Sequence, residues 1–229
     1  GNVAKHKPRH KMTKHEMKED KFVTSMMKGA GYLRENSSSV AIIVILLIAG
    51  IAAAVIWRTT VTNKAEAART KLGVAQIAYR TGSFNESRDS LLALVNKYPE
   101  SEPAVTGQYL LGHIYYATGK ADSASIFWND FLAKQPTDED MKAAAEAGLA
   151  AIKADNGDLA GAAAEYESLY DKYPAYFDRD RWLFRAGLCY RDAGNGEKAM
   201  ELLRKYLDSA GETQTAYQAK VILSELEAG

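Results

Sequence analysis

The sequence has very little cysteine: Cys189 is the only one among 229 residues. A single thiol forms no intramolecular disulfide and provides no cysteine-based structural zinc site. Helix packing alone must therefore stabilise the fold, and we interpret Cys189 as a small core residue. One cysteine does not identify the redox compartment.

The short motifs that mark common active sites are also missing. The sequence contains no P-loop, Gly-x-Gly-x-x-Gly, His-Glu-x-x-His or Gly-x-Ser-x-Gly pattern. After His15 it has one histidine, His113, which is far along the chain from Cys189. The acidic run Asp138, Glu139 and Asp140 suits the positive end of a helix better than acid–base chemistry. We predict a non-enzymatic protein with no catalytic residue, no cofactor and no metal site.

Net charge is zero, with 29 basic and 29 acidic residues, but the charge is unevenly distributed. Residues 1–38 carry nine Lys or Arg against four acids, and residues 39–57 carry no charge. The remaining residues carry 20 basic and 25 acidic side chains. The two ends of the chain are therefore expected to face different surroundings.

One long apolar run separates these two parts. Residues 40–57 are 18 uncharged residues, and at ~1.5 Å per residue they span ~27 Å, close to the hydrocarbon thickness of a bilayer. A cleavable signal peptide is the competing interpretation, but the preceding region is too long and the apolar run exceeds the usual length. We predict a transmembrane helix over 39–57. The nine basic residues before it place the N-terminus in the cytoplasm and residues 58–229 outside, in the periplasm of a Gram-negative cell.

The basic segment, residues 1–38, has a pattern of its own. Thr13 and Glu16 form a capping box, and apolar residues recur at helical spacing at Phe22, Val23, Met26, Met27 and Leu33. A basic amphipathic helix is predicted, which would lie on anionic lipid, dock onto a cytoplasmic partner, or serve only as a topology signal. Three histidines, His6, His10 and His15, add basic character to this segment rather than a metal site.

The region from residue 64 onward is internally repetitive. Glycines in polar turns recur at almost equal intervals, at Gly82, Gly119, Gly157 and Gly194. Prolines that stop helices recur at the same interval, at Pro99, Pro136 and Pro174. Each unit is therefore a helix, a glycine turn, a second helix and a proline stop. We predict four units followed by a capping helix over 212–227.

The second unit carries the repeat pattern most fully, with Leu111, Gly112, Tyr115, Gly119, Ala124, Trp128 and Pro136. The fourth follows with Gly187, Tyr190, Gly194, Ala199 and Leu203, and the first and third are looser. This pattern resembles the tetratricopeptide repeat (TPR) family over nearly the whole region from residue 64 onward. The expected fold is an all-α, TPR-like helix-turn-helix solenoid behind one N-terminal transmembrane helix. The small residues Gly112 and Ala124 would let paired helices approach closely.

The resemblance implies a binding surface on the inner face of the solenoid. Its positions in this chain predict a partner site at Tyr79, Arg80, Tyr109, His113, Tyr116, Arg181, Phe184 and Arg191, above a smooth floor of Ala144, Ala147 and Ala151. Aromatic and arginine side chains suit an extended peptide or a partner helix. The competing interpretation is that these aromatics pack between repeats. The Lys and Asn residues of TPR carboxylate clamps are replaced, so no grip on a C-terminal carboxylate is implied.

The order of a cytoplasmic N-terminus, one membrane pass and an external TPR domain resembles the YfgM-like family of ancillary SecYEG translocon subunits. That resemblance implies an inner-membrane adaptor between the translocon and periplasmic chaperones. The alternative is a structural accessory subunit of a larger membrane complex. Small residues at Ala49–Ala54 offer a packing face for another transmembrane helix. The expected partners are other proteins and, through residues 1–57, membrane lipid; no nucleic acid is expected.

Overall fold

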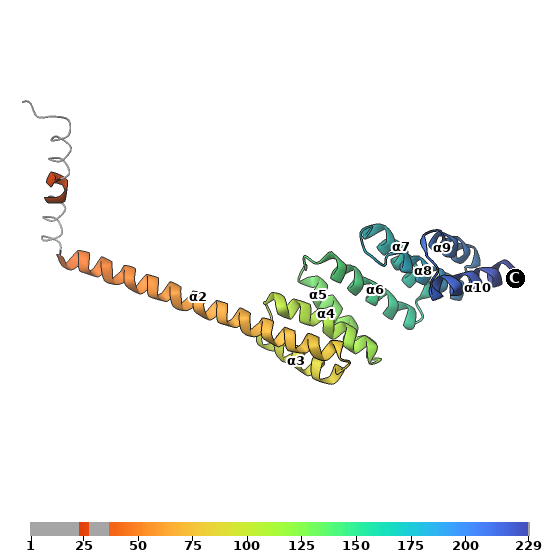
Figure 1. Ribbon diagram of the computed structural model, residues 1–229, viewed down its shortest axis with the longest axis horizontal. Coiled ribbons are helices and arrows are strands. Elements are labelled where there is room, and N and C mark those ends of the chain that lie inside the picture. Colours follow the sequence, from red (N-terminus) through yellow and green to blue (C-terminus); the bar gives the residue numbers. More distant parts are fainter. Residues whose placement is uncertain (1–22, 28–36, 229) are drawn as a thin grey trace, which may run out of the picture. The chain divides into compact units, whose positions relative to one another are not determined.

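The computed structural model describes residues 23–27 and 37–228 (Figure 1). Every regular element in these ranges is an α-helix, so the predicted all-α fold class is confirmed. The chain divides into two compact units, residues 1–62 and residues 63–229.

The first unit contains a helical turn at 23–27 and the beginning of α2 (Ser37–Arg80). Among the described residues, α2 alone is long and apolar enough to cross a membrane, and none of its apolar stretch is buried. The side chains from Ile42 to Trp57 that would face lipid are exposed. Membrane insertion of residues 39–57 stays a prediction. The rest of the amphipathic helix predicted between Thr13 and Leu33 lies outside the described residues.

The second unit is a series of helices in which neighbours along the chain pack on each other (Figure 1). Its members after α2 are α3 (Phe84–Lys97), α4 (Glu102–Ala117), α5 (Ala121–Ala133), α6 (Glu139–Asp155), α7 (Leu159–Lys172), α8 (Asp180–Asp192), α9 (Gly196–Ser209) and α10 (Gln214–Ala228). The pairs α2/α3, α4/α5, α6/α7 and α8/α9 are the four predicted units. The last helix begins two residues later than the sequence predicted.

The turns inside the four pairs have one backbone conformation. Gly82, Gly119, Gly157 and Gly194 have φ angles of 79°, 73°, 89° and 83°. Residues with a Cβ atom are strained in this left-handed region, so glycine is favoured at each turn. The regular spacing of glycines in the sequence therefore indicates where these turns lie. The predicted cap is also confirmed, since the Asp138 carboxylate accepts a hydrogen bond from the Met141 N–H at 2.9 Å.

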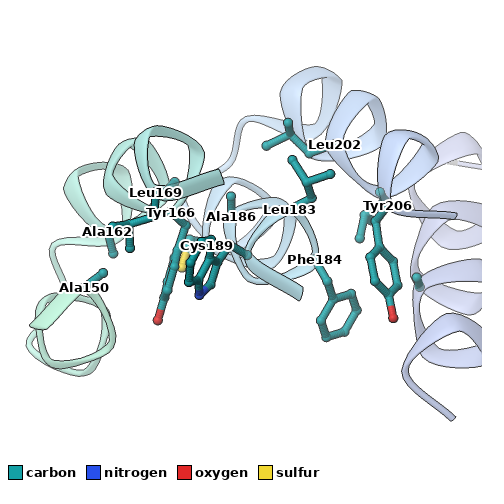
Figure 2. Packing of buried hydrophobic residues seen from close by; sticks show 14 of the residues in the cluster. Ala150, Ala162, Tyr166, Leu169, Leu183, Phe184, Ala186, Cys189, Leu202 and Tyr206 are labelled. Carbon is teal, nitrogen blue, oxygen red and sulfur yellow. The ribbon is translucent and has the colours of Figure 1, made fainter. Parts of the chain in front are cut away.

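The core is built from the positions that the repeat pattern marks as small or large. Those that are at most 2% exposed include Ala75, Ser87, Leu91, Ala124, Trp128, Ala150, Ala162, Tyr166, Ala199 and Leu203. The buried Ser87 hydroxyl donates to the Ala75 carbonyl at 2.8 Å, which satisfies the polar group and ties α3 to α2. Figure 2 shows the C-terminal part of this core, where Leu183 of α8 faces Leu202 of α9.

The tightest approach in the core surrounds Trp128 of α5. A Cβ added to Gly112 of α4 would lie 2.3 Å from the indole, and one added to Gly148 of α6 would lie 2.4 Å from the opposite edge of the same ring. Real Cβ atoms do not approach a neighbour this closely, so only glycine fits at either position. Trp128 is 1% exposed and fills the space that the two glycines leave.

Gly112→Ala is therefore expected to destabilise the domain. The indole cannot move away from a new methyl group because Gly148 confines its other edge, and overpacking of this kind costs about 1–3 kcal/mol. The melting temperature should fall by about 2–4 °C per kcal/mol. Gly73→Ala is the matched control, since nothing lies within 4 Å of a Cβ at that helical glycine of α2. Equal melting temperatures of the two variants would contradict the packing described here.

Candidate binding groove

An open groove of about 290 Å³ lies on the second unit between α4, α6 and α8. Its floor is the face of α6 formed by Ala144, Ala147, Gly148 and Ala151. These positions share a face because they are three or four residues apart on a helix. Since their side chains are short, the backbone of α6 is recessed below the larger side chains of α4, α7 and α8. The groove therefore follows from the alanine-rich sequence of α6.

The wall on the α4 side ends in Tyr116. Its hydroxyl donates a hydrogen bond to the Asp155 carboxylate at 2.9 Å, which fixes the ring against the end of α6. Burial, and then this hydrogen bond, raise the pKa of Tyr116. The ring is neutral at physiological pH and offers a flat aromatic face to the groove.

The opposite wall comes from α7, α8 and the loop between them. Tyr166 of α7 is 2% exposed, and its burial raises the pKa of its hydroxyl to about 12, while the nearby positive charge of Arg185 acts in the other direction. Tyr176 in the loop and Trp182 of α8 also line the groove. Their rings stack with centroids 4.7 Å apart and an interplanar angle of 8°.

His113 of α4 lies at the base of the groove. Its ring meets those of Tyr109 and Trp128 edge-on, at centroid distances of 4.6 and 5.2 Å. The Nε2 atom is buried and has no hydrogen-bond partner among the described residues. Burial lowers the pKa of His113 from 6.5 to about 4, so the imidazole is neutral at physiological pH. The base of the groove is therefore uncharged.

Three of the eight predicted partner-site residues line the groove: His113, Tyr116 and Arg181. The predicted alanine floor lines it as well. The other residues predicted on the first two units lie elsewhere. Tyr109 packs against Phe131 at 5.4 Å, Tyr79 packs against Phe84 at 5.7 Å, and Arg80 is exposed at the end of α2.

The remaining two predicted residues, on α8, are turned away from the groove. Phe184 is 8% exposed, and its ring faces Tyr206 of α9 at 5.5 Å, as Figure 2 shows. Arg191 pairs with the neighbouring Asp192 at 2.7 Å and does not line the groove. The ring of Phe184 belongs to the C-terminal core, and α8 instead presents Arg181, Trp182 and Arg185 to the groove.

Four residues that line the groove were not predicted as site residues from the sequence: Tyr166, Tyr176, Trp182 and Arg185. Arg185 follows the predicted Arg181 by one helical turn, and this spacing is the signal that would have identified it. Tyr176 stands in a loop, where helical periodicity gives no information. Tyr166 is 2% exposed and belongs mostly to the core, so its contribution to the groove gives no separate signal in the sequence.

Among the described residues, no group of three or more His, Cys, Asp or Glu side chains is placed to hold a metal ion. Cys189 is 7% exposed within the C-terminal core, and burial raises the pKa of its thiol, so it is protonated at neutral pH.

The lowered pKa of His113 predicts that the folded domain becomes less stable as the pH falls below 6.5. Below pH 6.5 the unfolded chain takes up a proton at His113 that the folded chain accepts only near pH 4, so stability is lost as the pH falls through this window. The melting temperature of the parent should therefore drop further between pH 7 and pH 5 than that of His113→Phe. Parallel drops in both proteins would show that the imidazole titrates normally.

Three comparisons place this architecture among known proteins. A family model described as a tetratricopeptide repeat-like domain matches residues 31–181, and a tetratricopeptide repeat model matches residues 183–213. No curated protein matches the chain. Among solved structures, a tetratricopeptide repeat protein from Parabacteroides merdae ATCC 43184 is similar with a TM-score of 0.58 and 20% identity. That match covers 70% of this chain and 60% of the other.

The MamA protein is similar with a TM-score of 0.54 and 17% identity, over 70% of this chain and 86% of that one. At these identities the solved structures show the fold alone. The family model, however, spans well over half of the sequence, from before the apolar helix to the start of α8. The chain therefore belongs to the tetratricopeptide repeat-like domain family.

Proposed function

We propose that this protein is a non-enzymatic interaction scaffold or chaperone-like adaptor, tethered to the bacterial inner membrane and associated with the protein-translocation machinery. Tetratricopeptide repeat folds typically serve as scaffolds for protein–protein interaction, which is the general basis of the proposal. The groove between α4, α6 and α8 is the observation that carries it for this chain.

The groove has the composition of a protein-recognition site. Its floor of short side chains leaves space for a bound segment of a partner. Its walls are tyrosine, tryptophan and arginine, the residue types that contribute most binding energy in interfaces. Aromatic rings give large contact areas at a small cost in conformational entropy. These features support the binding of a partner's chain segment.

The tether is supported by the apolar part of α2 and by the charge asymmetry of the chain. The span is uncharged and exposed, and nine basic residues precede it. The family model begins at residue 31, so it includes this apolar segment as well as the first three repeats. We propose that residues 1–38 are cytoplasmic and that the repeat domain lies in the periplasm.

Association with the translocon rests on the resemblance to YfgM-like subunits. That arrangement puts a binding groove on the periplasmic side, where translocated chains emerge unfolded and expose extended segments. A structural accessory role in another membrane complex would instead use the span itself, through its small residues at Ala49–Ala54.

Site-specific photo-crosslinking in intact cells of the source organism tests the proposal. A photoreactive residue would replace Ala147 in the groove, Ala53 in the span, or the exposed Ala93 of α3 as the matched control outside the groove. We expect crosslinks from Ala53 to translocon subunits and from Ala147 to translocated or chaperone proteins, with none at Ala93. Crosslinks from Ala53 alone to a different complex would favour the structural role. Crosslinks from Ala147 to cytoplasmic proteins would reverse the proposed topology.

A further inference from the structure

The groove contains one arginine that forms no ion pair among the described residues. Arg181 pairs with Asp178 at 3.1 Å, so its charge is already balanced. Arg185, one turn further along α8, is exposed and lines the same groove. Among the described residues, no carboxylate forms an ion pair with its guanidinium, whereas Arg191 and Arg204 each have such a partner at 2.7 Å. The lining therefore has one positive charge in excess.

Arg185 lies close to an aromatic ring of each wall. Its charge acts on the hydroxyls of both Tyr116 and Tyr166, which come from α4 and α7. A planar guanidinium beside two tyrosines is suited to a carboxylate, because it donates two parallel N–H groups in a fixed fork.

An exposed aromatic ring lies in the chain between the groove-lining residues Tyr176 and Asp178. Phe177, in the loop between α7 and α8, is 86% exposed. Its ring contacts Tyr176 at a centroid distance of 4.9 Å, and Tyr176 stacks in turn on Trp182. The Arg179 guanidinium donates to the Pro174 carbonyl at 3.2 Å, which braces the same loop. The contact with Tyr176 supports the Phe177 ring while most of it stays exposed to solvent. An exposed aromatic ring of this kind is suited to contact an apolar side chain of a partner.

The size of the groove limits what it holds. A helix with its side chains is ~10–12 Å across, and a volume of about 290 Å³ lies at the lower end of the range for ligand sites. The space fits a few residues of an extended chain. The alanine floor leaves no large side chain to compete for it.

We propose that the groove binds an extended peptide segment with an internal Asp or Glu held by Arg185 and an apolar neighbour packed on Phe177. This inference rests on the proposed scaffold function, since it names the kind of segment that the scaffold would recognise. A side-chain carboxylate is meant, not a chain terminus.

Peptide binding to the full-length protein in nanodiscs tests this inference. The probes are fluorescein-labelled heptapeptides with blocked ends, Ala-Ala-Glu-Leu-Ala-Ala-Ala and the same sequence with Gln in place of Glu, measured by fluorescence anisotropy. We expect the Glu peptide to bind the parent about tenfold more tightly or better, because a hydrogen bond between charged groups replaces one to a neutral amide. The blocked ends remove the terminal carboxylate, so the two probes differ only in the side chain that Arg185 would hold.

Protein variants identify the residue that causes the preference. Arg185→Gln should bind both peptides equally, and Arg204→Gln, on α9 outside the groove, should keep the preference. Phe177→Ala should weaken both peptides by a similar factor, because it removes the apolar contact and leaves the charge. Equal binding of both peptides to the parent, a preference that survives Arg185→Gln, or no binding of either peptide would overturn the inference. The crosslinking result is independent of these outcomes, so the scaffold function stands or fails separately.

Discussion

The rest of the repeat domain depends on the packing of Trp128 between two glycines. The indole comes from α5, and the glycines that admit it, Gly112 and Gly148, come from α4 and α6. One side chain therefore sets the distance between the two helices of the second repeat and the distance to the third repeat. Repeats of a solenoid contact only their neighbours, so a spacing fixed at one junction is passed along the stack.

The groove is a consequence of that junction. Trp128 holds α6 close to α4, and the short alanine side chains of α6 form a low floor, so the rings of Tyr116 and Tyr166 become walls of the groove. The same arrangement buries His113 beside the indole. The bottom of the groove therefore carries a neutral imidazole. Stability and recognition thus meet on one face of α6, because Gly148 both admits Trp128 and lines the groove. The excess positive charge in the groove comes from α8.

Sequence reasoning predicted most of this fold because the repeat depends on local rules. Turn glycines need positive φ, and stop prolines follow the ends of α3, α5 and α7, so both are visible in spacing alone. The binding surface was only partly predictable. The inner face of α8 depends on how α9 and α10 cover Phe184, and the position of Tyr176 depends on a loop. Gly148 gave no signal either, because the ring that requires it belongs to a different helix of a different repeat.

Hydrogen exchange of the Gly148→Ala variant tests the central role of this junction most directly. The substitution pushes α6 away from Trp128 without touching the turns, the caps or the C-terminal core. The account predicts that amides of α4, α5 and α6 lose protection, while those of α9 and α10 keep the protection of the parent. Unchanged protection in α4–α6, or an equal loss throughout the domain, would show that the Trp128 contact does not set the spacing of these repeats.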